Sequence, residues 1–299
     1  MLRILLLSVL CVFAFGKPII SVSIPPQAFF VKKIAKDSVE INILIPPNSD
    51  EHTMEFKPQA LKKLEQSEIY FLADLELEKI LEKKFKSVLK NVKIVNINEG
   101  IHLLEGGHDH EHEHDHDHDH DHDRHHAEEH DEHNDPHVWL DPILVKKLAQ
   151  NITQALVQSF PNNKEFYEAN LANFLKELDQ MDAQIAEKLK NIKRNEFIVY
   201  HPSWAYLAKR YNLVQIPVEI DGKEPKSKDL QNLIKLAKEK DIRVIFVQPG
   251  FPENSAKVLA KELNAQIVSI NHLARNWDEE LLKSIQALSS ALQCERFLF

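Results

Sequence analysis

The feature that most constrains the fold is a run of 31 residues, 163–193, that contains neither glycine nor proline. Apolar residues recur along this run at helical spacing: Leu171, Phe174, Leu175, Leu178, Met181, Ile185, Leu189 and Ile192. Their single stripe predicts one amphipathic helix. At ~1.5 Å per residue the helix is about 45 Å long, which is longer than a small domain is wide. We therefore expect it to act as a rigid backbone that joins two lobes.

Short β-rich runs alternate with helical runs on both sides of this helix. Strands are expected at residues 19–24, 39–44, 69–72 and 92–97, and again at 197–200, 214–218, 243–247 and 266–270. Helices are expected at 27–36, 58–66, 75–89 and 143–160, and again at 204–211, 228–240, 252–263 and 277–292. This alternation predicts an α/β fold of two parallel-sheet α/β lobes joined by one long rigid helix. Because ligands bind outside the carboxyl ends of parallel strands, the binding site is expected in the interdomain cleft. In the first lobe, Asp74 is expected to cap the helix that begins at residue 75.

These elements divide the chain into four parts. A signal peptide is expected at residues 1–16, an N-terminal α/β lobe at 17–162, the linker helix at 163–193 and a C-terminal α/β lobe at 194–299.

The N-terminus has the features of an export signal. Arg3 precedes an apolar run that is too short to anchor the chain in a bilayer, and small residues follow at the cleavage positions. Cys11 lies in this run in a poor lipid-attachment motif, so lipid anchoring is not favoured but is left open. After cleavage Cys294 is the only cysteine, and no disulfide can form within the chain. We expect a soluble, monomeric protein in a bacterial periplasm.

Charge and glycine spacing exclude two classes of partner. The six glycines nowhere have the spacing of a phosphate-binding loop, which argues against nucleotide binding. The chain carries a net charge of −9, but residues 108–133 alone carry −11, so the remainder is close to neutral. A nucleic-acid surface needs a basic stripe, and we expect no nucleic-acid partner.

The acidic segment 108–133 alternates histidine with aspartate or glutamate and has almost no apolar residues. Such a segment cannot bury a core, so we expect a mobile loop within the N-terminal lobe. Its histidines and acids are predicted to capture metal ions loosely, although a solvated charge run without a role is the alternative. The histidines are His108, His110, His112, His114, His116, His118, His120, His122, His125, His126, His130 and His133.

Three other histidines lie in loops next to predicted strands or helices: His52, His137 and His201. Imidazole suits Zn²⁺, and three histidines with one further position form a familiar zinc site. Asp135 and Asp141 flank His137 and are candidates to orient its second ring nitrogen. Spacing alone does not make these histidines a motif, so the weight rests on the sequences around them.

The sequences around these histidines resemble a known family, the periplasmic zinc-binding components of ABC importers, from about residue 18 to 292. PPNSDEHTMEFKP, which contains His52, is similar to the family's HxYEP-like loop. NDPHVWLDP, with His137, is similar to its DPHxWLDP signature, and YHPSWAYLAKRYNL followed by VEIDGKEP is similar to its third-ligand segment. The resemblance implies two α/β lobes bridged by one long helix. It also implies zinc ligands at His52, His137 and His201, and delivery of zinc to a membrane ABC permease, with ATP hydrolysed elsewhere.

The fourth ligand is open. Manganese-binding members of the family carry a carboxylate on a loop that reads like IDPLA, whereas this chain has Asn271 and His272 there. This difference weakens a manganese assignment, although copper is not excluded by affinity order. Glu51 or water is expected to fill the fourth position. His272 is an alternative for which a surface loop residue is the simpler interpretation, and His102 is interpreted as a surface residue.

A receptor that captures zinc and does no chemistry is the leading functional hypothesis. A zinc hydrolase or lyase is the first alternative, but the chain has no HExxH motif and no evident acid–base pair near the three histidines. A metal-buffering surface adhesin is the second alternative. A catalytic zinc keeps an open position beside a substrate pocket, whereas a transport site is expected to be closed.

Overall fold

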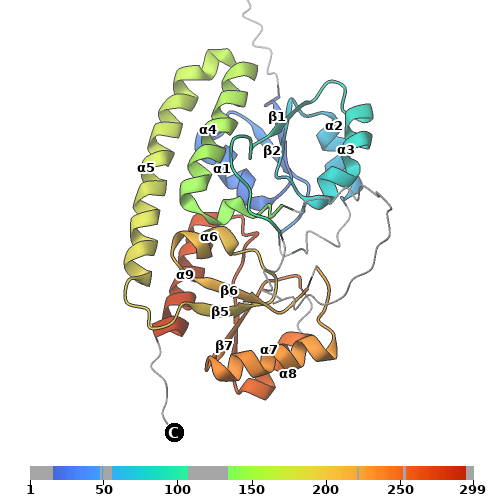
Figure 1. Ribbon diagram of the computed structural model, residues 1–299. Coiled ribbons are helices and arrows are strands. Elements are labelled where there is room, and N and C mark those ends of the chain that lie inside the picture. The colour runs from blue at the N-terminus through green and yellow to red at the C-terminus, as the bar shows by residue number, and fades with distance from the viewer. Residues whose placement is uncertain are drawn as a thin grey trace, which may run out of the picture.

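The computed structural model describes residues 16–47, 49, 56–106, 134–220, 222–251 and 254–293. Its first body, in the upper half of Figure 1, contains a parallel sheet. The strand order of this sheet is β2-β1-β3-β4. The strands are β1 (Ile19–Val22), β2 (Glu40–Ile43), β3 (Ile69–Leu72) and β4 (Lys93–Asn96). The helices that connect these strands are α1 (Pro25–Ala35), α2 (Pro58–Glu65) and α3 (Glu76–Val88).

The second body repeats this plan. Its parallel sheet has the order β6-β5-β7-β8, which matches the first sheet strand for strand. The strands are β5 (Glu196–Val199), β6 (Val214–Pro217), β7 (Val244–Val247) and β8 (Gln266–Ser269). The connecting helices are α6 (Ala205–Arg210), α7 (Ser227–Glu239) and α8 (Asn254–Leu263).

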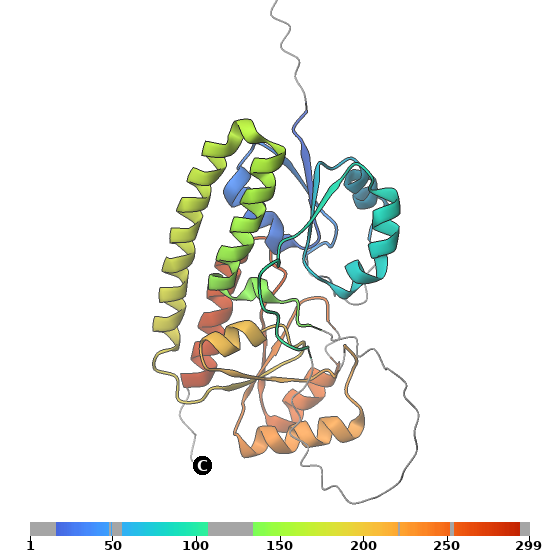
Figure 2. The ribbon, with the colours of Figure 1, turned by 45° about the horizontal axis from the view of Figure 1, so that its top comes forward.

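Three longer helices join the two sheets along one side of the molecule. They are α4 (Pro142–Ser159), α5 (Lys164–Leu189) and α9 (Trp277–Gln293). Figure 2 shows α5 running beside both bodies, with α4 and α9 between it and the sheets. Helix α5 contacts α1, α4 and α9, and its buried residues belong to one apolar core that extends into both bodies. The two bodies are therefore joined by a packed layer of helices in addition to the single linker helix α5.

Two aspartates precede helices, but only one of them acts as a side-chain cap. Asp141 accepts hydrogen bonds from the backbone N–H groups of Ile143 and Leu144 and so begins α4. At α3 the prediction that Asp74 acts as the cap is wrong. Asp74 has a φ of 61°, and its carboxylate accepts a hydrogen bond from Asn96.

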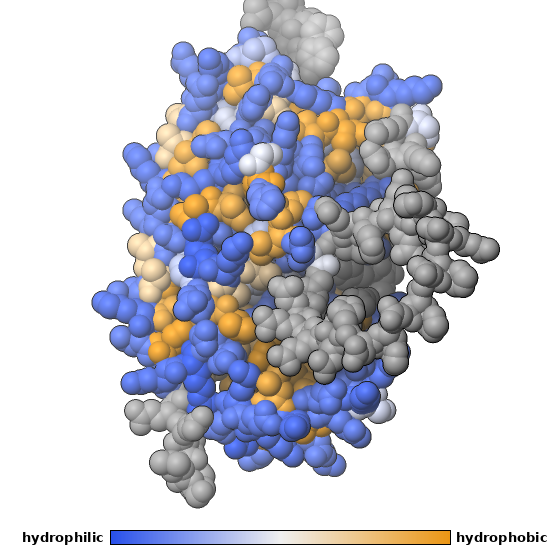
Figure 3. Space-filling view, viewed as in Figure 1, coloured by the Kyte–Doolittle hydropathy of each residue, from blue (hydrophilic) through white to orange (hydrophobic). Residues whose placement is uncertain are grey.

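The predicted strands and helices are all present, and their ends differ by at most two residues except in α5, which ends at Leu189 and not at the predicted residue 193. Two parallel α/β sheets and a long connecting helix confirm the predicted fold class. None of the helices in the described ranges is long and apolar enough to cross a membrane. Figure 3 shows a face that is largely hydrophilic, with apolar residues in small patches.

Several sequence predictions fall outside the described residues. They concern the signal peptide with Cys11, the loop with Glu51 and His52, the histidine-rich segment 108–133, and Cys294. The described residues on either side of the histidine-rich segment, however, lie next to each other. Glu105 and Asn134 form an isolated antiparallel bridge, and the backbone N–H of Asp135 donates to the carbonyl of Leu104 at 2.8 Å.

Candidate metal centre

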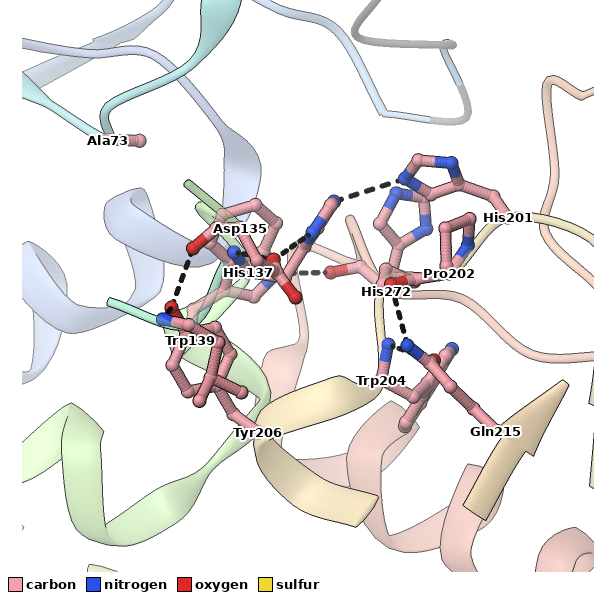
Figure 4. Close-up of polar contacts among 12 residues, drawn as sticks. Ala73, Asp135, His137, Trp139, His201, Pro202, Trp204, Tyr206, Gln215 and His272 are labelled. Carbon is pink, nitrogen blue, oxygen red and sulfur yellow. Dashed lines mark hydrogen bonds and ion pairs between the residues drawn. The ribbon is translucent and has the colours of Figure 1, made fainter. Parts of the chain in front are cut away.

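Three buried histidines converge between the two bodies: His137, His201 and His272 (Figure 4). One ring nitrogen from each lies within 4.8 Å of the others. The side chains come from distant points in the chain, and the residues are only 4%, 2% and 1% exposed, respectively. His137 stands just before α4, His201 follows β5 and His272 follows β8. Buried imidazoles in such a group are candidate metal ligands.

Asp135 fixes the ring of His137. Its Oδ1 accepts a hydrogen bond from the backbone N–H of His137 at 2.8 Å and lies 2.6 Å from the ring Nδ1. Tyr206, from α6 of the second body, donates to the carbonyl of Asp135 at 2.6 Å. The same hydroxyl accepts the backbone N–H of Leu104 at 2.9 Å. The segment with His137 is therefore held by the contacts of its own Asp135 and by Tyr206 of the second body.

His201 has an equivalent carboxylate. Its Nδ1 lies 2.6 Å from Oε1 of Glu219, a buried residue just beyond β6. Gln248, just beyond β7, accepts the backbone N–H of His201 at 3.2 Å and donates to its carbonyl at 2.6 Å. The ring of Phe251 stacks on the imidazole, with centroids 4.7 Å apart and an interplanar angle of 16°. Residues that follow the two strands on either side of β5, together with Phe251, thus hold His201 in place.

His272 is held through its backbone. The indole N–H of Trp139, two residues after His137, donates to the carbonyl of His272 at 2.9 Å. Trp277 in turn donates its indole N–H to the carbonyl of Trp139 at 2.8 Å. The first hydrogen bond joins the segment with His137 to the loop with His272. The second joins the same segment to the start of α9.

The protonation of these rings favours a bound cation. Because Asp135 and Glu219 accept from Nδ1 of His137 and His201, each Nδ1 carries the hydrogen of a neutral imidazole. The two Nε2 atoms face each other at 3.1 Å. Two nitrogens bound to one tetrahedral zinc at ~2.0–2.1 Å lie about 3.3 Å apart, close to this separation. A divalent ion between the rings would be bound by both nitrogens, so the donor set fits Zn²⁺.

Of the ligands predicted from the sequence, the structure brings two together, and the others lie outside the described residues. His137 and His201 lie together, whereas His52 and Glu51 are outside the described residues. Asp135 contacts the ring of His137, while Asp141 caps α4 and pairs with Arg210.

The structure also tests the interpretation of His272 and His102, and it reveals residues near the centre that the sequence analysis did not identify. The interpretation of His272 as a surface residue is wrong, because it is 1% exposed, whereas His102 is exposed. Glu219 and Gln248 were not recognised. A carboxylate or amide directly after a predicted strand, as in the VEIDGKEP segment, was the available signal.

The comparisons with known proteins agree with this geometry. The family model for the periplasmic zinc-uptake complex component A, ZnuA, matches residues 20–293. The high-affinity zinc uptake system protein ZnuA of Bacillus subtilis is 33% identical over 264 residues, which cover 87% of this chain and 80% of that protein. The zinc-binding lipoprotein AdcA of Streptococcus pneumoniae is 28% identical over 268 residues, and the match spans 89% of this chain and 52% of AdcA.

Solved structures are similar over nearly the whole chain. A crystal structure of a ZnuA matches with a TM-score of 0.82 at 36% identity and covers 92% of this chain and 99% of that one. A zinc-bound deletion mutant of ZnuA has the same TM-score and identity and covers 94% of this chain and 100% of that one. The predicted family is confirmed. This chain belongs to the ZnuA family and is the substrate-binding component of a zinc-uptake ABC transporter, a transport protein and not an enzyme.

Proposed function

We propose that this chain captures Zn²⁺ in the periplasm with high affinity, as an exported monomer, and delivers it to a membrane ABC permease. The observation that carries the proposal is the pair of facing Nε2 atoms of His137 and His201, each ring backed by a carboxylate. A transport site needs donors that enclose the ion and leave no open position for a substrate. The burial of these rings supports such an enclosed site.

The proposed ligands are His52, His137 and His201. His52 comes from the resemblance of its loop to the family's ligand loop, and the position of its side chain is part of the proposal. Asp135 and Glu219 act behind the ligands: they keep the hydrogen on Nδ1 of each ring, so that Nε2 is the atom that binds the ion. Glu51 and water remain candidates for a further position.

The histidine-rich segment 108–133 is proposed as a collector of loosely bound zinc. The composition of the segment predicts that each ion bound there costs conformational entropy, and we therefore expect the individual sites to be weak. The bridge between Glu105 and Asn134 brings together the described residues that flank the segment, and Asn134 directly precedes Asp135. Ions on the segment are therefore held at high local concentration near the tight site.

Zinc uptake by cells tests the proposal. A strain that lacks this protein is supplied with the wild-type chain or with the double variant His137→Ala/His201→Ala, and uptake of radioactive zinc is measured in zinc-depleted medium. His102→Ala is the matched control, because His102 is exposed and outside the cluster. We expect wild type and control to support uptake and the double variant to fail, with growth restored by added zinc. Equal uptake with the double variant would contradict the proposal.

A further inference from the structure

The donors that the described part of the chain brings together at the centre are nitrogen atoms. Among the described residues, the group that could hold a metal ion consists of His137, His201 and His272, without a carboxylate. The two nearby carboxylates, Asp135 and Glu219, contact the Nδ1 atoms of the first two rings. They therefore lie behind those rings, on the side away from the facing Nε2 atoms.

Buried aromatic side chains surround the ring of His272. Its ring centroid is 6.0 Å from that of His137 and 5.7 Å from that of His201. The ring of Phe251 lies 5.8 Å away and closes another side. The hydrogen bond from the Trp139 indole to its carbonyl fixes the backbone of the loop. A histidine that is 1% exposed and surrounded by these rings is directed into the centre.

Its neighbour Asn271 does not supply an anionic alternative. The side chain is a neutral amide, and its Oδ1 accepts the backbone N–H of Leu273 at 3.0 Å, within the same loop. The loop after β8 therefore offers the centre the imidazole of His272.

We propose that His272 is a metal ligand and the residue by which this chain selects zinc over manganese. The inference rests on the proposed zinc-capture function and names the donor that sets its selectivity. Mn²⁺ is a hard ion that prefers carboxylate and water oxygens, whereas imidazole suits Zn²⁺. Mn²⁺ is also the weakest binder of the first-row divalent ions at a nitrogen site. The imidazole of His272 in place of a carboxylate therefore favours zinc on both counts.

Among the described residues, two carboxylates that contact the ligand rings compensate the charge of the ion. Asp135 and Glu219 each form a short contact with the far nitrogen of a ligand ring, which makes the imidazole a better donor and spreads negative charge towards the ion. Both carboxylates are buried, so solvent screens them little. The centre combines neutral nitrogen donors with two negative charges one ring away, and this suits a borderline-soft dication.

Substitution of His272 by an acid tests this directly. Zinc and manganese dissociation constants are measured by chelator competition for wild type, His272→Asp and the matched control His102→Asp, which places an acid at an exposed site. His272→Asp is expected to reduce the zinc-over-manganese preference by at least about tenfold. It should also change the visible absorption of the Co²⁺-loaded protein, whereas His102→Asp should leave both unchanged.

His272→Asn separates donor chemistry from packing and also carries the test if His272→Asp does not fold. This neutral, smaller residue should lower zinc affinity at least about tenfold without raising manganese affinity. The inference is overturned if either folded variant keeps the wild-type preference within twofold and an unchanged cobalt spectrum. If His137→Ala abolishes tight zinc binding in that case, the proposed function still stands. If wild type itself binds no zinc tightly, the proposed function fails.

Discussion

The indole N–H of Trp139 donates to the backbone carbonyl of His272, 133 residues further along the chain, at 2.9 Å. Trp139 belongs to the segment that carries His137, so one hydrogen bond joins two loops that both contribute to the metal centre. The two loops cannot separate without leaving a buried carbonyl unpaired, which costs about 1–3 kcal/mol. The hydrogen bond of Trp139, which lies outside the histidine rings, therefore helps to hold the centre together.

Trp139→Phe removes this hydrogen bond and keeps most of the ring. We expect the free energy of unfolding to fall by about 1–3 kcal/mol and zinc affinity to fall by about tenfold because the His272 loop is less well held. Urea unfolding and chelator competition measure the two effects. Trp204→Phe is the matched control, because the buried indole N–H of Trp204 has no hydrogen-bond partner among the described residues. Equal effects of the two substitutions would refute the special role of Trp139.

Zinc binding should stabilise the chain with little movement between the two bodies. Helix α5 packs against α1, α4 and α9, so bending between the sheets would disturb one continuous apolar core. At ~1,000 times the dissociation constant, zinc adds about 4 kcal/mol to the free energy of unfolding. Small-angle X-ray scattering of the zinc-free and zinc-bound protein should give superimposable curves. A clear decrease in the radius of gyration would show a domain closure that this packing does not predict.

Glu219→Gln tests the carboxylate behind His201. The amide oxygen can still accept the Nδ1 hydrogen, but the negative charge is lost, so zinc affinity should fall by about 10–100-fold while the fold is retained. Affinity is measured by chelator competition and the fold by circular dichroism. Glu224→Gln, at an exposed position of the following loop, should have no effect. Unchanged affinity in Glu219→Gln would mean that the charge of the carboxylate does not act on the ion.

The buried carboxyl group of Glu78 makes stability depend on pH. It contacts the hydroxyl of Ser23 and accepts the backbone N–H groups of Ala73 and Leu75. Burial nevertheless raises its pKa from 4.5 to about 7, because the charged form is poorly solvated there. A carboxyl group with a raised pKa in the folded chain contributes its full stability at low pH and loses it as the pH rises. The loss therefore falls between about pH 4.5 and pH 7.

Comparison of wild type with Glu78→Gln isolates this contribution. The free energy of unfolding of wild type, relative to the variant, should fall by about 3 kcal/mol from pH 4.5 to 7.5. Urea unfolding of the zinc-free protein at several pH values gives the difference. Glu76→Gln, at an exposed position on the same helix turn, should show no such trend. A difference that stays constant over the whole range would show that the group does not titrate there.

Deletion of residues 108–133 tests the collector proposal. Total zinc per molecule should fall and one tight site should remain. In the intact chain the loose ions should be released on acidification through roughly pH 6, because histidine with a reference pKa of ~6.5 must be neutral to bind metal. Equilibrium dialysis at a series of pH values follows both classes of site. Loss of the tight site on deletion, or release of the tight ion before the loose ones, would exclude the collector.

The fold could be predicted because its signals are local. Alternating apolar runs and the 163–193 stripe depend on neighbours within a few residues, and the structure has the expected strands and helices. Asp74 shows the limit of local reasoning, since a backbone φ of 61° turns it away from the helix it was expected to cap.

The centre was only partly predictable. His137 and His201 lie beside expected element ends, and that position made them candidates. His272 was misjudged because its burial depends on Trp139 and Phe251, which lie elsewhere in the sequence. Glu219 was missed because its contact with His201 depends on the pairing of β5 with β6, which periodicity does not reveal.

The most direct test of the central claim is the zinc stoichiometry and affinity of the chain lacking residues 108–133, measured by chelator competition. The account predicts one tightly bound zinc per molecule in this protein and in its His102→Ala form. It predicts loss of affinity by at least about 100-fold in the His137→Ala/His201→Ala form, with the fold retained. One tightly bound zinc of unchanged affinity in that double variant would contradict the account and place the site elsewhere.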